Sequence, residues 1–183
     1  EGSLNHLDAN LSFDYEDISI PASETRDSVW ERHGILFLND NTRENAAIAD
    51  LESAGFLRRG SNGHFVLKNK DAILQFLAHG YPAFRTRWQT SVGERFEHAL
   101  TQIEPIETSL NFRSGGEDWF AMDVGFSTTS GDTISQQEIE RLLQMGQTGK
   151  KLANGKTAVL NMNLAESFGD ILTDCDPEQI KAG

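Results

Sequence analysis

The chain has 183 residues, which is long enough for one domain with a substantial core or for two small subdomains. Apolar residues make up 38% and charged residues 24%, an ordinary balance for a globular protein, and no stretch reaches the roughly 20 apolar residues that span a bilayer. A net charge of −12 argues against binding nucleic acid over the whole surface by charge alone.

The termini and the cysteine content bear on the compartment. Cys175 is the single cysteine, so no internal disulfide can form, and this suits a reducing compartment. No signal-peptide pattern is present, and we expect a cytoplasmic protein without a membrane partner. Because the sequence begins Glu-Gly-Ser and ends Lys-Ala-Gly just past an acidic segment, we also expect a fragment of a longer protein.

Positive charge gathers in one segment. Residues 56–92 contain six cationic side chains and one acidic side chain, Asp71, a local balance of +5 inside an acidic chain. The cations are Arg58, Arg59, Lys68, Lys70, Arg85 and Arg87. An anionic partner would dock here, although a solvated face of one subdomain explains the same pattern.

The first elements follow from apolar spacing. Residues 11–20 alternate apolar and polar side chains, which predicts a half-buried strand ended by Pro21. Apolar residues at helical spacing predict one helix over 24–38 and a second over 42–54, and Gly55 follows the second where a C-cap glycine is expected.

A turn and a third helix come next. Asn62-Gly63 predicts a tight turn before a strand at 64–67, and Asn69 can cap the helix that follows. Two residues are expected to end that helix, Gly80 and Pro82.

The middle of the chain permits two interpretations. Within 86–113, Ser91 and Glu94 match a capping box and so favour a helix, while the flanking residues favour strands, and the first half of this stretch stays ambiguous. The residues after Pro105 predict a strand, and 119–126 predicts another.

The last third has the clearest local signals. Ser135 and Glu138 form a capping box, so a helix begins there, and Gly146 ends it. Asn154-Gly155 predicts a hairpin, and residues 163–172 have the apolar spacing of a final helix. Together the elements predict an α+β fold of mixed helices and mainly antiparallel strands in two small subdomains, at 1–92 and 93–183.

Motifs for nucleotide or metal chemistry are missing from the sequence. The segment GQTGKK at 146–151 fails the phosphate-loop pattern, because Gln144 stands where its first glycine belongs and Lys151 follows the lysine in place of serine or threonine. The five histidines are scattered without the paired spacing of a zinc site. We therefore expect no metal and no cofactor.

The acidic stretch at 115–135 is the one candidate for catalysis. Converging carboxylates could hold a metal ion or act as an acid and a base. Asp118 and Asp123, however, are five residues apart in a predicted strand, so they point to opposite faces. Glu117 could join Asp123 on one face, whereas Asp132 follows a predicted turn, and strand-edge and turn carboxylates explain the group more simply.

Three motifs in this part of the chain carry a family resemblance. GGEDWFAMDVGF, GDTISQQEIERLLQMGQ and KKLANGKTAVLNM, in that order, resemble the N-terminal accessory region of bacterial Swi/Snf-related helicases. The first half agrees with it, through Phe13 and Tyr15 in an opening strand and Ala54-Gly55-Phe56 at a helix end. The resemblance covers most of the chain.

The resemblance implies a part of a DNA-dependent ATPase that lacks the motor. The family's ATP-binding and helicase motifs lie in two downstream RecA-like domains, so no catalytic residue carries over to this chain. The expected role is to pack against, position or regulate the motor of the same polypeptide, or to contact its DNA, RNA or protein substrate.

Candidate binding residues follow from the basic segment. We expect Arg58, Arg59, Arg85 and Arg87 to contact phosphates of DNA or RNA and Trp88 to stack on a base. Two alternatives stay open at this point, a metal-dependent hydrolase or nuclease that uses Glu117, Asp118 and Asp123, and a free-standing protein-interaction module.

Overall fold

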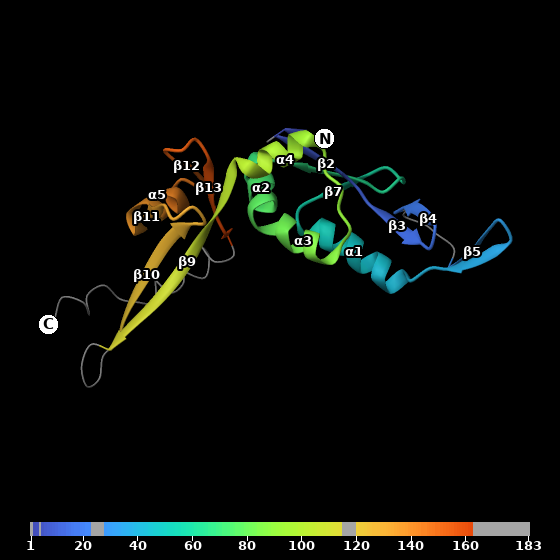
Figure 1. The fold of residues 1–183 in the computed structure, drawn as a ribbon, viewed down its shortest axis with the longest axis horizontal. Coiled ribbons are helices and arrows are strands. Elements are labelled where there is room, and N and C mark those ends of the chain that lie inside the picture. The colour runs from blue at the N-terminus through green and yellow to red at the C-terminus, as the bar shows by residue number, and fades with distance from the viewer. Residues whose placement is uncertain (1, 4, 23–27, 115–119, 163–183) are drawn as a thin grey trace. The chain divides into compact units, whose positions relative to one another are not determined.

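A computed structural model describes residues 2–3, 5–22, 28–114 and 120–162 (Figure 1). Helices and mainly antiparallel strands are mixed along the chain, which confirms the predicted α+β class. The chain divides into two compact units, the first comprising residues 1–73 and 91–96 and the second residues 74–90 and 97–183. The subdomain boundary at residues 92 and 93 stays a prediction.

The first unit contains a four-stranded antiparallel sheet. Its order is β1 (Gly2–Ser3), β2 (His6–Asn10), β8 (His64–Lys68) and β7 (Leu57–Arg59). Leu7 lies opposite Leu67, and both are buried together with Phe65 of β8. One face of this sheet therefore supplies core side chains, and the strand predicted at 64–67 is confirmed as β8.

Two separate hairpins replace two predicted elements in this unit. Residues 11–20 form β3 (Ser12–Tyr15) and β4 (Ile18–Pro21), so the prediction of a single strand is wrong. The chain reverses at Glu16, which has a positive φ of 52°. The alternation of apolar residues shifts by one position between Tyr15 and Ile18, and the two polar residues there, Glu16 and Asp17, form the turn.

The helix predicted over 24–38 is also wrong where the structure describes it. β5 (Val29–Arg32) and β6 (Ile35–Leu38) form an antiparallel hairpin in its place, named the β5–β6 hairpin below. The two residues between the strands, His33 and Gly34, have positive φ values of 54° and 79°, as in the two-residue turns that join twisted strands. Aromatic and β-branched residues beside this turn favour strands over a helix.

The second predicted helix is confirmed as α1 (Asn41–Ser53). Asp40 accepts a hydrogen bond from the backbone N–H of Arg43 and so caps its first turn. Leu51 packs into the core, and Gly55, with φ of 89°, ends the helix as expected. For α1, the capping residues at both ends and the burial of Leu51 therefore agree with the predicted helix.

The helices that follow Asn69 do not end where predicted. α2 (Lys70–Gln75) runs into a π-helical turn, η1 (Phe76–Gly80), and then into α3 (Tyr81–Arg87). The N–H of Tyr81 donates to the carbonyl of Phe76, a π-type bond that carries the chain past Gly80. Pro82 lies in the first turn of α3, where its missing N–H costs no hydrogen bond, so Gly80 and Pro82 do not stop the chain.

The second unit is built on a five-stranded sheet in the order β11-β10-β9-β13-β12 (Figure 1). The long hairpin of β9 (Ile103–Ser114) and β10 (Phe120–Thr128) lies at its centre and confirms both predicted strands. The other strands are β11 (Thr133–Ile134), β12 (Gly149–Lys151) and β13 (Thr157–Leu160). β13 joins β9 in parallel, while the remaining pairs are antiparallel.

The core of this unit lies between the sheet and α5 (Gln136–Gln144). Ile139 and Leu142 of the helix pack with Ile106, Phe126 and Leu160 of the strands. The Ser135–Glu138 capping box is present as predicted, and Gly146 has the positive φ of a C-cap. The Asn154-Gly155 hairpin is confirmed, whereas the helix predicted at 163–172 lies outside the described residues.

One helix crosses the ambiguous stretch. α4 (Glu94–Thr101) begins at the glutamate of the Ser91 and Glu94 pattern and has no fully buried residue. Across the parts of the chain that the structure describes, no helix is long and apolar enough to cross a membrane.

Candidate interaction surfaces

Arg58 and Arg59 of the basic segment lie next to each other on β7, in the first unit, and point to opposite faces of the sheet. Arg58 is half-buried, with its guanidinium 5.4 Å from the ring centre of Phe65, and its Nε atom is buried without a hydrogen-bond partner. Arg59 is exposed. Arg59 is therefore the better placed of the two to meet an anion, and Arg58 has a packing role.

The other predicted contacts lie in the second unit. Arg85 and Arg87 are exposed on α3, and the Arg87 guanidinium lies 5.5 Å from the ring centre of Phe84. Trp88 packs edge-on against Phe84, with 4.6 Å between ring centroids. Trp88 is thus half-buried in an aromatic group, and only part of it is available to stack on a base.

The acidic stretch does not assemble a site in what the structure describes. Glu117 and Asp118 lie outside the described residues, and Asp123 is on β10 opposite Asn111. Asp132 lies in the turn between β10 and β11, where its N–H donates to Thr128 Oγ1 at 3.2 Å. Within the residues placed by the structure, no group of three or more His, Cys, Asp or Glu side chains could hold a metal ion.

A polar cluster lies on the four-stranded sheet, on the face opposite Leu7, Phe65 and Leu67. Asp8 on β2 lies 3.1 Å from His6 Nε2 and 3.0 Å from His64 Nε2. Burial alone would raise the pKa of Asp8, but the hydrogen bonds from His64 and His6 outweigh it and hold that pKa below its usual value. The three side chains are half-exposed, and the cluster links the neighbouring strands β2 and β8.

Glu104 is the most strongly perturbed carboxylate. It is buried on β9 and accepts hydrogen bonds from Lys156 Nζ at 2.6 Å and Ser130 Oγ at 2.5 Å. These bonds, that of Lys156 foremost, lower the pKa of Glu104 to about 2 against the opposing effect of burial. The carboxylate ties the β10–β11 turn to the β12–β13 hairpin, so its role is structural.

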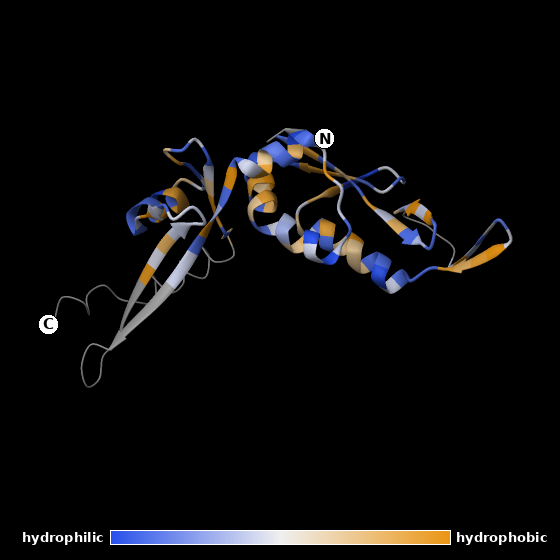
Figure 2. Cartoon of the chain, in the orientation of Figure 1, coloured by the Kyte–Doolittle hydropathy of each residue, from blue (hydrophilic) through white to orange (hydrophobic). Residues whose placement is uncertain are grey.

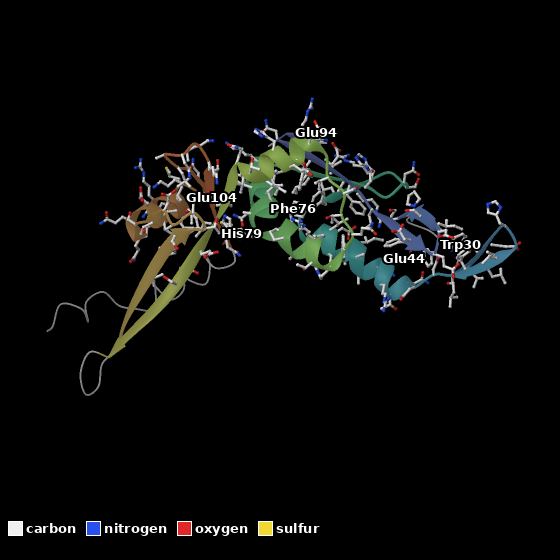
Figure 3. The ribbon with its side chains drawn as sticks, viewed as in Figure 1. Trp30, Glu44, Phe76, His79, Glu94 and Glu104 are labelled. Atoms are coloured by element: carbon white, nitrogen blue, oxygen red, sulfur yellow. The ribbon has the colours of Figure 1, made fainter. Side chains whose placement is uncertain are left out.

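Two polar side chains join the helices of the second unit to its sheet. Gln75 Nε2 donates to the carbonyl of Leu160 at 2.5 Å, and His79 lies 3.1 Å from the carbonyl of Val159 (Figure 3). Because a carbonyl only accepts, His79 donates Nε2–H. Burial lowers the pKa of His79, although the bond to Val159 acts in the opposite direction, so the ring is held neutral.

The most unusual surface is one that the sequence did not predict. Four large apolar side chains of the β5–β6 hairpin are exposed, out of six such side chains in the residues that the structure describes. They are Val29, Ile35, Leu36 and Leu38. Figure 2 shows hydrophobic residues running along this hairpin, which belongs to the first unit. The sequence signal that favours this hairpin is the set of β-branched and aromatic residues on both sides of His33-Gly34, although the same stretch also fits helical spacing.

The strand register divides these side chains between two faces. Val29 lies opposite Leu38 and Glu31 opposite Leu36, so these four share one face, called the outer face below. Trp30 lies opposite Phe37 on the other face, where the two rings stack with centroids 4.4 Å apart.

Polar contacts fix the stacked face to the rest of the unit. Trp30 Nε1 donates to the buried Asn39 Oδ1 at 2.7 Å, and the ring of Tyr15 meets Trp30 edge-on. The Tyr15 hydroxyl donates to Glu44 at the start of α1 (Figure 3). Tyr15 of β3, Asn39 and the start of α1 therefore hold the hairpin in one orientation, with its outer face turned away from these contacts.

The chain matches the family described as bacterial SNF2 helicase associated over residues 3–182. Comparisons with curated proteins and with solved structures gave no match. The family match spans both compact units and includes the motifs around Asp118-Trp119-Phe120 and the Ser135 capping box. The chain therefore belongs to the bacterial SNF2 helicase associated family, which confirms the resemblance seen in its sequence.

Proposed function

We propose that this chain is a non-catalytic accessory or regulatory domain of a DNA-dependent SNF2-type ATPase, with the motor domains elsewhere in the same polypeptide. The observation that carries the proposal is the family match over residues 3–182. The sequence adds support, because its one phosphate-loop candidate, at 146–151, fails the pattern that ATP binding requires.

The polar clusters of the described residues support the same conclusion. Asp8 is bonded to two histidines, Glu104 to Lys156 and Ser130, and Glu138 to Lys150 and Ser135. Each of these carboxylates has a lowered pKa because its ionised form accepts hydrogen bonds within the fold. Carboxylates with a lowered pKa stay ionised at neutral pH, so they suit a structural role and hold no proton to give as a general acid. We propose that the domain acts through its surfaces, in the cytoplasm.

The test compares the full-length polypeptide with a version that lacks residues 3–182. We expect the DNA-stimulated ATPase rate to change on removal, while nucleotide binding by the motor persists, since an accessory domain shifts the motor between states and supplies none of its catalytic groups. Equal rates with and without the domain, over a range of DNA concentrations, would remove the proposed role.

Contact with DNA or RNA is a second part of the proposal. It is favoured by the local charge of +5 over residues 56–92 and by the exposure of Arg59, Arg85 and Arg87. Phosphate contacts by arginine supply affinity without reading sequence. The arginines fall in two units, so we propose two separate contact regions, β7 and α3.

Filter binding with the full-length polypeptide at several salt concentrations tests this part. Removing one arginine that binds a phosphate should lower the slope of log affinity against log salt by about 1. We expect this reduction for Arg59→Ala, a reduction of about 2 for Arg85→Ala combined with Arg87→Ala, and a smaller effect for the half-buried Arg58. Exposed Arg95 and Arg141 provide controls with the same change of charge. Slopes that fall equally in the controls, or in none of the variants, would exclude the contact.

A further inference from the structure

The outer face of the β5–β6 hairpin is apolar and open. Val29, Leu36 and Leu38 are 51%, 70% and 73% exposed, and the register places all three on that face. Glu31 is the fourth residue on it and is also exposed. A cluster of large aliphatic side chains left in water on one strand pair is a recognised mark of an interaction site.

The opposite face explains why this cluster keeps its shape. Trp30 and Phe37 stack there, and their contacts with Tyr15 and Asn39 hold the hairpin against β3 and the start of α1. An isolated two-stranded hairpin is only marginally stable in water, so this anchoring keeps the outer face in a fixed form before any partner binds. Binding then requires little ordering of the hairpin, which favours affinity.

The size of the outer face limits what can occupy it. Three partly exposed aliphatic side chains offer roughly a few hundred Å². A stable complex between separate proteins buries about 800 Å² on each partner, so this face is too small to hold a second copy of the chain by itself. A partner in the same polypeptide needs less buried area to stay bound, because the connecting chain raises its effective concentration to about millimolar.

We infer that the outer face of the β5–β6 hairpin is the surface through which this domain docks onto a motor domain of the same polypeptide. The inference rests on the accessory role proposed above and names the surface that performs it. Its occupant is an apolar groove that accepts Leu36 and Leu38, with a lysine or arginine at its edge to meet Glu31. An acidic rim is excluded, since it would face both Glu31 and a chain of net charge −12.

Site-specific photo-crosslinking in the full-length polypeptide tests the docking surface. A benzophenone-bearing phenylalanine analogue is placed at the position of Leu36 in one protein and at that of Ile35 in a matched control. These positions are neighbours on β6, and Ile35 is 53% exposed but lies on the opposite face. We expect intramolecular crosslinks to motor-domain peptides from position 36, identified by mass spectrometry, and far fewer of them from position 35.

Three results would overturn the inference. Equal yields from both positions would show that the contact with the motor does not depend on the outer face. Crosslinked dimers would assign the outer face to a second copy of the chain. Absence of any crosslink from position 36 would show that no motor domain contacts the outer face. Leu38→Ser in the protein labelled at position 36 should lower the intramolecular yield, whereas Glu107→Gln, on an exposed residue of β9, should not.

ATPase rates separate this inference from the accessory role. Leu36→Ser with Leu38→Ser should change the DNA-stimulated rate in the same direction as removal of residues 3–182, while Ile35→Ser should leave it unchanged. If removal alters the rate and the double variant does not, the accessory role stands and the docking surface is wrong. If removal itself has no effect, the accessory role fails as well.

Discussion

Glu104 shows how a single buried side chain makes stability depend on pH. Its carboxylate is 4% exposed and joins Lys156 to Ser130, and its pKa in the fold is about 2 against an ordinary 4.5. A carboxylate whose pKa is lowered by folding stabilises the protein fully above its unfolded pKa, and that contribution is lost as the pH falls toward the folded pKa. The sensitive range is therefore from about pH 4.5 down to about pH 2.

Replacement of this carboxylate by an amide should remove that dependence. We expect Glu104→Gln to lower the free energy of unfolding at neutral pH by about 2 kcal/mol, because a charge-assisted hydrogen bond to Lys156 is lost. The variant should also show a flatter fall in stability below pH 4.5. Urea unfolding at several pH values measures both effects, with Glu107→Gln on the same strand as the control. A pH profile parallel to that of the unmodified protein would contradict this assignment.

His79 should act in a separate and higher pH range. Its pKa is lowered by burial, so protons bind more readily to the unfolded chain, and stability should decline as the pH falls below about 6.5. His79→Gln keeps an N–H donor for the Val159 carbonyl and removes the titration. We expect near-unchanged stability at neutral pH and a weaker decline in acid. His98→Gln, at an exposed position of α4, should leave the decline as it was.

At the scale of elements, two Asn-Gly turns provide a matched pair. Gly63 and Gly155 both follow asparagine and have positive φ values of 67° and 84°. A Cβ at Gly155 would meet no atom within 4 Å, whereas one at Gly63 would lie 2.3 Å from the Leu11 carbonyl oxygen and 2.7 Å from the Ala22 nitrogen. Neighbouring backbone atoms therefore crowd the turn at Gly63, whereas the turn at Gly155 has free space around it.

The two glycines should therefore respond differently to the same substitution. Gly155→Ala should cost about 1 kcal/mol, the backbone strain of a left-handed residue. Gly63→Ala should cost roughly 1–3 kcal/mol more, because backbone at Leu11 and Ala22 must move. Thermal unfolding followed by circular dichroism compares them, and equal losses would show that strain alone determines the outcome.

Elements with strong local signals could be predicted from the sequence, and elements fixed by tertiary contacts could not. The capping box at Ser135 and the Asn154-Gly155 turn specify their own geometry, so α5 and the β12–β13 hairpin were predicted correctly. The β5–β6 hairpin does not follow from the sequence, because Val29, His33 and Leu36 also fit helical spacing. The stacking of Trp30 on Phe37 that stabilises the strands is a tertiary contact.

For the candidate surfaces too, local sequence patterns could be predicted, whereas exposure set by tertiary contacts could not. Clustering of the cations along the chain identified Arg58, Arg59, Arg85 and Arg87, but burial decided which of them face water, and Arg58 does so only in part. The outer face of the β5–β6 hairpin cannot be predicted from helical spacing over 24–38, because exposure of Leu36 and Leu38 depends on the strand register.

For the whole molecule, the excess of negative charge predicts a response to salt. A net charge of −12 destabilises the compact state through repulsion between like charges. Raising the ionic strength from about 0.01 M to about 0.1 M shortens the Debye length from about 30 Å to about 10 Å. We expect the free energy of unfolding at neutral pH to increase over this range, because salt screens the repulsion between exposed acids more than it screens the partly buried Glu104–Lys156 pair.

The same measurement near the isoelectric point provides the control. At about pH 4.7 the net charge vanishes, so added salt should no longer stabilise the fold. Sodium chloride and potassium chloride should act alike if screening is the cause. A stabilisation that persists at the isoelectric point, or that depends on the ion, would point to specific ion binding in place of general screening.

The parallel pairing of β13 with β9 affects the order in which the second unit can fold during synthesis. Thr157 lies beside Ile103, so these strands can meet only after the β9–β10 hairpin, α5 and the β12–β13 turn have been synthesised. Contacts between residues so far apart in sequence form slowly, because a long loop must close first. On the ribosome, Ile106 and its neighbours on β9 must therefore wait for Leu160 to emerge, and in that interval the sheet has an unpaired edge that could capture another nascent chain.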